Sequence, residues 1–206
     1  KNLTCPLKKT SCSLLASVLC LSLVTPALAA SPTGFQAFTK TNLGAYEKFT
    51  DIDQSKWYGS SKQGVIKTAC ELNILNGMSP TKFDPEGTLR LNEAVKIACV
   101  IHALYTGQAD PLQPGTGKHW ADPYLAYAEA NGILQKDEFT NYDRPATRSE
   151  MAHIFAKSLP EDGLKKINTI LSINDVERDD LSPVPYAADI FKLYRAGVLA
   201  GEPKTH

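Results

Sequence analysis

The stretch Ala146-Thr147-Arg148-Ser149-Glu150-Met151 has the residue pattern of a helix start. Thr147 and Glu150 have the spacing of a capping box. In that motif the Thr oxygen accepts from the third helical amide, and the Glu carboxylate accepts from the Thr N–H. Ile154 and Phe155 continue an apolar stripe at helical spacing. The sequence therefore predicts a helix after Thr147, with Thr147 and Glu150 in structural roles.

Arg148 is the residue in this stretch that the helix start does not explain. It stands at the first helical position, where the helix dipole mildly disfavours a cation. An anionic sugar beside the helix would explain it, because Arg binds a carboxylate with two parallel hydrogen bonds and free helical amides add donors. The alternative is an ordinary surface arginine.

The segments around this stretch belong to a unit that recurs three times. Each copy opens with an apolar residue two positions before an Asp, namely Asp51, Asp122 and Asp175. A helical stretch follows and ends on an Asn or Gly with an apolar tuck, a typical helix stop. The first two copies continue through a Pro-containing turn into a second amphipathic helix. Each unit is therefore predicted to be a helix-loop-helix.

Two helices with one apolar stripe each cannot close a core, so the copies must pack on one another in an all-α fold. The sequence is predicted to be organised into seven segments. These are a signal peptide at 1–29, a lead-in linker at 30–48, repeats at 49–106 and 119–160, a loose linker at 106–118, a connector at 161–172 and an incomplete repeat at 173–206. The stretch Leu164 to Leu171 is apolar enough to add a short helix. The given sequence ends at His206, before a second helix of the third copy would begin. We therefore expect the natural chain to continue.

The first residues are typical of a secretory signal. Lys1, Lys8 and Lys9 precede an apolar run that is too short to span a bilayer, and Ala27-Leu28-Ala29 forms a cleavage site before Ala30. We therefore expect a secreted protein of the cell surface, without a stable membrane span. A retained amino-terminal anchor is the alternative, and the short run argues against it.

Charge and cysteine content narrow the class of protein further. Without the signal, 19 basic residues face 22 acidic ones, a formal charge of −3. Nucleic acid is therefore not an expected partner, because phosphate binding needs a concentrated basic excess. Cys70 and Cys99 remain, both on apolar helix faces where free cysteine acts as a small hydrophobe. A Cys70–Cys99 bridge is the alternative.

No pattern of catalytic or metal-binding residues is present in the sequence. The histidines are scattered without the paired spacing of a zinc site, and there is no nucleophile elbow or phosphate loop. The start of a calcium loop at Asp51 lacks its turn Gly, which Lys56 replaces. We expect no catalytic residue, metal or cofactor here, although a catalytic domain beyond residue 206 stays open.

The order of landmarks over roughly residues 45–206 resembles the surface-layer-homology family. Residues 146–151 are similar to its I-T-R-A-E signature. The resemblance implies a pseudo-threefold, three-pronged helical spindle around a central three-helix bundle. It also implies binding of secondary cell-wall polysaccharide, often with pyruvylated sugars, by which the family holds surface-layer proteins and exoenzymes on the envelope.

The resemblance makes Arg148 and the opening aspartates, Asp51, Asp122 and Asp175, candidate polysaccharide ligands. From the residues alone, Asp122 before Pro123 is better explained by a helix N-cap.

Copy one departs from the signature, because Leu91 stands where the Arg belongs and Arg90 where the Thr belongs. Arg90 is a candidate only if the helix start shifts by one residue. Trp57 either stacks on a sugar ring or fills the core, whereas Trp120 is expected in the core.

The expected function is non-covalent anchoring to the cell wall through secondary polysaccharide or a peptidoglycan-linked glycan. Two alternatives stay open. One is a protein–protein assembly module, with other surface-layer subunits as partners. The other is a targeting module of an exported hydrolase whose catalytic domain lies downstream.

Overall fold

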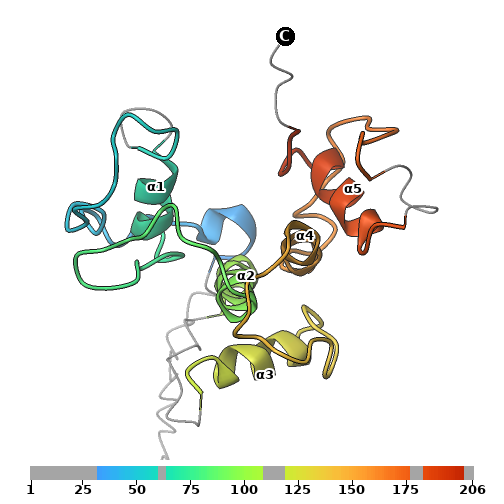
Figure 1. Ribbon diagram of the computed structural model, residues 1–206, viewed down its shortest axis with the longest axis horizontal. Coiled ribbons are helices and arrows are strands. Elements are labelled where there is room, and N and C mark those ends of the chain that lie inside the picture. The colour runs from blue at the N-terminus through green and yellow to red at the C-terminus, as the bar shows by residue number, and fades with distance from the viewer. Residues whose placement is uncertain (1–31, 60–63, 109–118, 177–182, 202–206) are drawn as a thin grey trace, which may run out of the picture. The chain divides into compact units, whose positions relative to one another are not determined.

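The computed structural model describes residues 32–59, 64–108, 119–176 and 183–201. These ranges contain a 3-10 helix, η1 (Gly34–Ala37), and five α-helices: α1 (Val65–Glu71), α2 (Leu91–Thr106), α3 (Asp122–Ala130), α4 (Arg148–Lys157) and α5 (Ala187–Arg195) (Figure 1). No strand occurs in them, which confirms the all-α prediction. The predicted signal peptide and most of the predicted loose linker lie outside the described residues.

Within the ranges predicted as repeats, α1 and α2 lie in copy one, α3 and α4 in copy two, and α5 in copy three. The first helix of each copy ends in the same way. Ile74, Ile133 and Val198 each donate an N–H, at 2.9 Å, to the carbonyl five residues earlier. The preceding residues have left-handed φ values, namely 58° at Asn73, 71° at Gly132 and 73° at Gly197. This is the hydrogen bond of a Schellman helix end, so the three copies share one local fold.

The copies pack on one another, because no pair of helices closes a core alone. Helix α2 contacts α3 and α4, and α4 contacts α5. One buried cluster joins α2 to copy two, and a second joins α4 to α5. A third cluster lies within copy one and includes Phe49, Tyr58 and Ile66. Closure into a three-pronged spindle stays a prediction.

Cys70 and Cys99 are free thiols, and both are buried. This agrees with their interpretation as small hydrophobic residues. They lie in different clusters, Cys70 within copy one and Cys99 between α2 and copy two. Cys99 Sγ–H donates to the Tyr124 carbonyl at 3.3 Å. Burial raises the pKa of the Cys99 thiol to about 12, so it stays protonated and inert.

The segment 32–48, expected as part of a linker, contacts the repeats. Helix η1 packs against α2, and the rings of Phe35 and Tyr105 form a T-shaped pair with centroids 5.3 Å apart. Lys40 Nζ lies 2.7 Å from Glu71 Oε2. The lead-in is therefore attached to copy one and α2 rather than extended into solvent.

The short helix expected at Leu164–Leu171 is wrong. Ile167 and Asn168 instead donate their N–H groups to the Arg195 carbonyl, at 2.8 and 2.9 Å. That carbonyl lies at the end of α5, where no intrahelical donor is left for it. The segment therefore completes the end of α5.

None of the described helices is both long and apolar enough to cross a bilayer.

Candidate ligand-binding site

The start of α4 carries both hydrogen bonds of a capping box. Thr147 Oγ1 accepts from the Glu150 N–H at 3.3 Å, and Glu150 Oε2 accepts from the Thr147 N–H at 2.8 Å. Arg148 is the first helical residue and is exposed. Its guanidinium forms no hydrogen bond or ion pair with any described residue, so it is available to an external anion.

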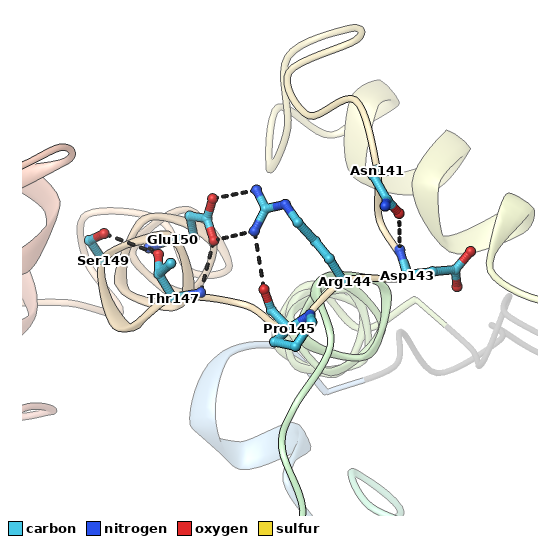
Figure 2. A network of polar contacts seen from close by, with 7 residues as sticks. All are labelled: Asn141, Asp143, Arg144, Pro145, Thr147, Ser149 and Glu150. Atoms are coloured by element: carbon cyan, nitrogen blue, oxygen red, sulfur yellow. Dashed lines mark hydrogen bonds and ion pairs between the residues drawn. The ribbon is translucent and has the colours of Figure 1, made fainter.

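A second contact at this helix start was not foreseen from the sequence (Figure 2). Arg144 donates to Glu150 twice, from Nη1 to Oε2 at 2.9 Å and from Nη2 to Oε1 at 2.6 Å. These charge-assisted bonds, opposed by partial burial, lower the pKa of Glu150 to about 2. Glu150 therefore fixes the turn at Arg144 as well as the helix start. An Arg six positions before a Glu matches no local motif, which is why sequence reasoning missed it.

In copy one, the stretch that corresponds to residues 146–151 contacts copy two instead of presenting an arginine at the position of Arg148. Helix α2 begins at Leu91 after the N-cap Arg90, so the helix start does not shift and Leu91 corresponds to Arg148. Leu91 is fully buried, and its N–H donates to the Arg144 carbonyl at 3.1 Å. The Asn92 N–H donates to Tyr142 O at 2.9 Å. The turn of copy two therefore covers the first amides of α2.

The Arg90 side chain is exposed and forms no hydrogen bond or ion pair with the described residues. It remains a ligand candidate only through its charge, because it does not occupy the position that corresponds to Arg148.

The three candidate aspartates have different surroundings. Asp51 accepts from the N–H groups of Phe83 at 2.9 Å and Asp84 at 2.8 Å, and these bonds lower its pKa. Asp175 is exposed and has no partner within the described ranges. No hydrogen bond or ion pair between described residues joins any candidate aspartate to Arg148.

Asp122 is not the N-cap of its helix, so that interpretation is wrong. Helix α3 begins at Asp122 itself, and the preceding Ala121 holds the N-cap position. Asp122 Oδ2 instead accepts the His119 N–H at 3.1 Å.

The structure has a pocket of about 750 Å³ between copy one, α2 and the start of copy two. Its walls are mostly apolar and include Ile66, Leu75, Met78, Phe83 and Ile97. Trp57, at 66% exposure, and Trp120, at 37%, also line it. Trp57 therefore presents its ring to solvent, and the expectation that Trp120 fills the core is wrong. Both indoles face one cavity although their copies are far apart in the sequence.

Lys96 gives this pocket a positive charge. Its Nζ lies 6.0 Å from the ring centre of Trp120 and 5.9 Å from that of Tyr124. It forms no ion pair with a residue that the structure describes. Glu93 also lines the pocket, but its carboxylate already accepts the Arg90 N–H at 2.8 Å. Sequence reasoning missed Lys96, because a lysine on an amphipathic helix resembles any surface lysine.

Aromatic faces beside a cation and carboxylates form a surface suited to a sugar ring with an anionic substituent. The indoles can stack on the apolar face of the ring, and Lys96 can pair with a carboxylate. Asp84 and Glu93 can accept hydrogen bonds from hydroxyls. No group of three His, Cys, Asp or Glu in the described ranges could hold a metal ion.

The chain is similar to two curated proteins of the bacterial envelope. It is 30% identical over 131 residues to a surface-layer 125 kDa protein of Lysinibacillus sphaericus, covering 59% of this chain and 11% of that protein. It is 27% identical over 115 residues to a protein named as an uncharacterized cell wall amidase of Bacillus anthracis, covering 54% of this chain and 21% of that protein. The chain thus spans a small part of either relative. No family model and no solved structure matches it.

Proposed function

We propose that this chain is a cell-wall-associated module that anchors a secreted protein by binding secondary cell-wall polysaccharide. The observation that carries the proposal is the pocket, in which Trp57, Trp120 and the unpaired Lys96 line one cavity. Sugars are commonly bound on exposed aromatic faces with a few polar groups around them. The similarity to a surface-layer protein and to a cell wall amidase supports a location at the cell wall.

The pocket favours a glycan that carries a negative charge, for which a pyruvylated sugar is one source. Lys96 already lies beside two aromatic rings, so a carboxylate placed there would gain a charged partner with little reorganisation. Arg148, exposed at the start of α4, is proposed as a second contact for the same polymer. The remaining candidates are of lower rank. Asp51 and Asp122 already accept hydrogen bonds from backbone N–H groups. Within the described ranges, Asp175 and Arg90 have no other candidate ligand residue paired with them.

Co-sedimentation with cell walls tests this function. The chain from residue 30 onward is mixed with walls before and after chemical removal of their non-peptidoglycan polymer. Binding should be lost on the stripped walls, and the released polymer should compete for the intact ones. Equal binding to both preparations would assign the chain to peptidoglycan instead.

Protein–protein assembly is the second candidate, favoured by exposed apolar side chains around copy three. Ile167, Leu171 and Val198 are 73%, 80% and 58% exposed. Sedimentation velocity without polysaccharide tests it, since an assembly module should self-associate alone and a glycan anchor should stay monomeric. The similarity to a protein named as an amidase is also compatible with this module targeting a hydrolase.

A further inference from the structure

One wall of the pocket contains a residue with an unusual backbone conformation. Asp84, an exposed residue of the turn between α1 and α2, has a left-handed φ of 63°. Of the four non-glycine residues with a positive φ in the described ranges, it is the one that lines the pocket. Such a φ is sterically unfavourable for a residue with a Cβ, and it persists only where the surroundings enforce it. The conformation of Asp84 therefore depends on its neighbours.

The carboxylate of Asp51 holds the backbone at this position. Its Oδ1 accepts the Phe83 N–H at 2.9 Å, and its Oδ2 accepts the Asp84 N–H at 2.8 Å. Asp51 lies 33 residues before Asp84, so this contact is tertiary and not a local turn hydrogen bond. It fixes the backbone of Asp84 and does not engage the Asp84 side chain. Asp51 thus acts as a positioning residue for the pocket wall.

Gly87 leaves room for the Asp84 carboxylate. The Gly87 N–H donates to the Asp84 carbonyl at 3.1 Å and closes the turn. The φ of Gly87 lies outside the left-handed region, so its backbone does not require a glycine. A Cβ at this position would instead clash with the carboxylate of Asp84. The turn therefore has its smallest residue where the Asp84 side chain lies.

These contacts leave the Asp84 carboxylate itself without a partner among the described residues. Glu93, the other acid of the pocket wall, already accepts the Arg90 N–H at 2.8 Å. An ionised carboxylate accepts hydrogen bonds and donates none, and its two oxygens can accept from two donors at once. Such a group in a mostly apolar wall is suited to a ligand that brings hydrogen-bond donors. On a sugar, neighbouring hydroxyl groups are donors of this kind.

We propose that Asp84 selects the sugar bound in the pocket by accepting hydrogen bonds from two neighbouring free hydroxyl groups of one ring. The inference rests on the proposed function and adds the hydroxyl pattern of the ligand to it. Trp57 and Trp120 stack on the ring, and Lys96 pairs with its anionic substituent. A sugar with those hydroxyls substituted would leave the Asp84 carboxylate desolvated without a donor. A site rejects an analogue in this way when it lacks a group that the site is built to bind.

Tryptophan fluorescence tests this role in the full chain, because both tryptophans of the sequence line the pocket. The probe is the polysaccharide released chemically from cell walls. Asp84→Gly removes the carboxylate and adopts a left-handed φ without strain. Affinity for the polymer should fall about ten- to a hundredfold, while the melting temperature should stay equal or rise. Unchanged affinity in this variant would overturn the proposal.

Asp137→Gly is the matched control. Asp137 is an exposed aspartate with a φ of 56°, but it does not line the pocket. The same substitution there should leave the affinity for the polymer unchanged. If Asp84→Gly melts well below Asp137→Gly, the role of Asp84 is structural and the proposal is wrong.

Gly87→Ala tests the position of the carboxylate rather than its presence. The added Cβ should displace the Asp84 side chain and lower the affinity about tenfold, with little change in melting temperature. In the Asp84→Gly background the same change should lower the affinity no further. A further loss of equal size would show that the Cβ obstructs the ligand directly, which contradicts the proposed position of the carboxylate.

The hydroxyl pattern is tested with the same polymer after O-methylation, with its carboxylates left free. Methylation should weaken binding to the unaltered chain about tenfold or more. The loss should be clearly smaller in Asp84→Gly, which already lacks the acceptor. Equal losses in the two proteins would refute selection by Asp84. Failure of the proposed function gives a different result, because then neither the unaltered chain nor Asp137→Gly would bind the released polymer, and both proposals would be wrong.

Discussion

Arg144 and Glu150 form a two-point contact, with Nη1 2.9 Å from Oε2 and Nη2 2.6 Å from Oε1 (Figure 2). The same Oε2 accepts the Thr147 N–H at 2.8 Å. One carboxylate therefore ties the turn of copy two to the first turn of α4. That turn also supplies the carbonyls that cover the first amides of α2. Glu150 thus stabilises the junction of the two signatures.

Glu150 should make stability depend on pH on the acid side. Its pKa is lowered to about 2 in the folded chain, so its contribution is present above the unfolded value of about 4.3 and is lost as pH falls through about 2. Glu150→Gln should cost about 1 to 2 kcal/mol at neutral pH, less than the full shift implies because Arg144 is partly exposed. Urea unfolding at about pH 7 and about pH 2 should show the two proteins converging in acid. Parallel curves would contradict the assignment.

Thr147 and Arg148 should separate stability from binding. Thr147→Ala removes the cap acceptor and should cost about 1 kcal/mol. Arg148→Ala removes no internal contact in the described structure, so stability should change by less than about 0.5 kcal/mol. Polysaccharide affinity should nevertheless fall about ten- to a hundredfold, with only part recovered in Arg148→Lys. Thermal melting and affinity are measured together, and unchanged affinity in Arg148→Ala would remove this residue from the site.

Lys96→Ala should weaken polysaccharide binding about tenfold or more, because the pocket loses its cation. Lys165→Ala is the matched control, since it removes the same charge from an exposed position of the connector. Isothermal titration at about 0.05 and 0.5 M salt should show a smaller salt dependence for Lys96→Ala than for the control. If both variants bind alike, the contribution of Lys96 is only that of net charge.

Gly77 and Gly132 both have a left-handed backbone, with φ of 77° and 71°, but different surroundings. A Cβ on Gly132 would meet no atom within 4 Å, so Gly132→Ala should cost only about 1 kcal/mol of backbone strain. A Cβ on Gly77 would clash with the Phe49 ring and approach the Lys82 carbonyl to 2.9 Å. Gly77→Ala should therefore destabilise the chain clearly more in denaturant unfolding. Equal losses would mean that Phe49 moves away freely.

Much of the local structure could be predicted because its signals act over a few residues. The helix start at Arg148 follows from reciprocal bonds across three positions. The shared helix ends depend on single residues, such as Gly132, that adopt a left-handed φ. The error at Leu164–Leu171 has the opposite cause, since its amides are used by α5, about thirty residues further along the chain.

Local signals were enough to predict the all-α class and the start of α4, because caps, helix ends and apolar periodicity act within one turn or one face. The tertiary packing, by contrast, sets which side chains meet between copies. It buried Leu91 under the turn at Arg144, set Lys96 beside Trp120, and placed His153 between Glu138 and Asp189. These contacts join residues from separate repeats, whose approach depends on how apolar faces pack and which polar groups must find partners there.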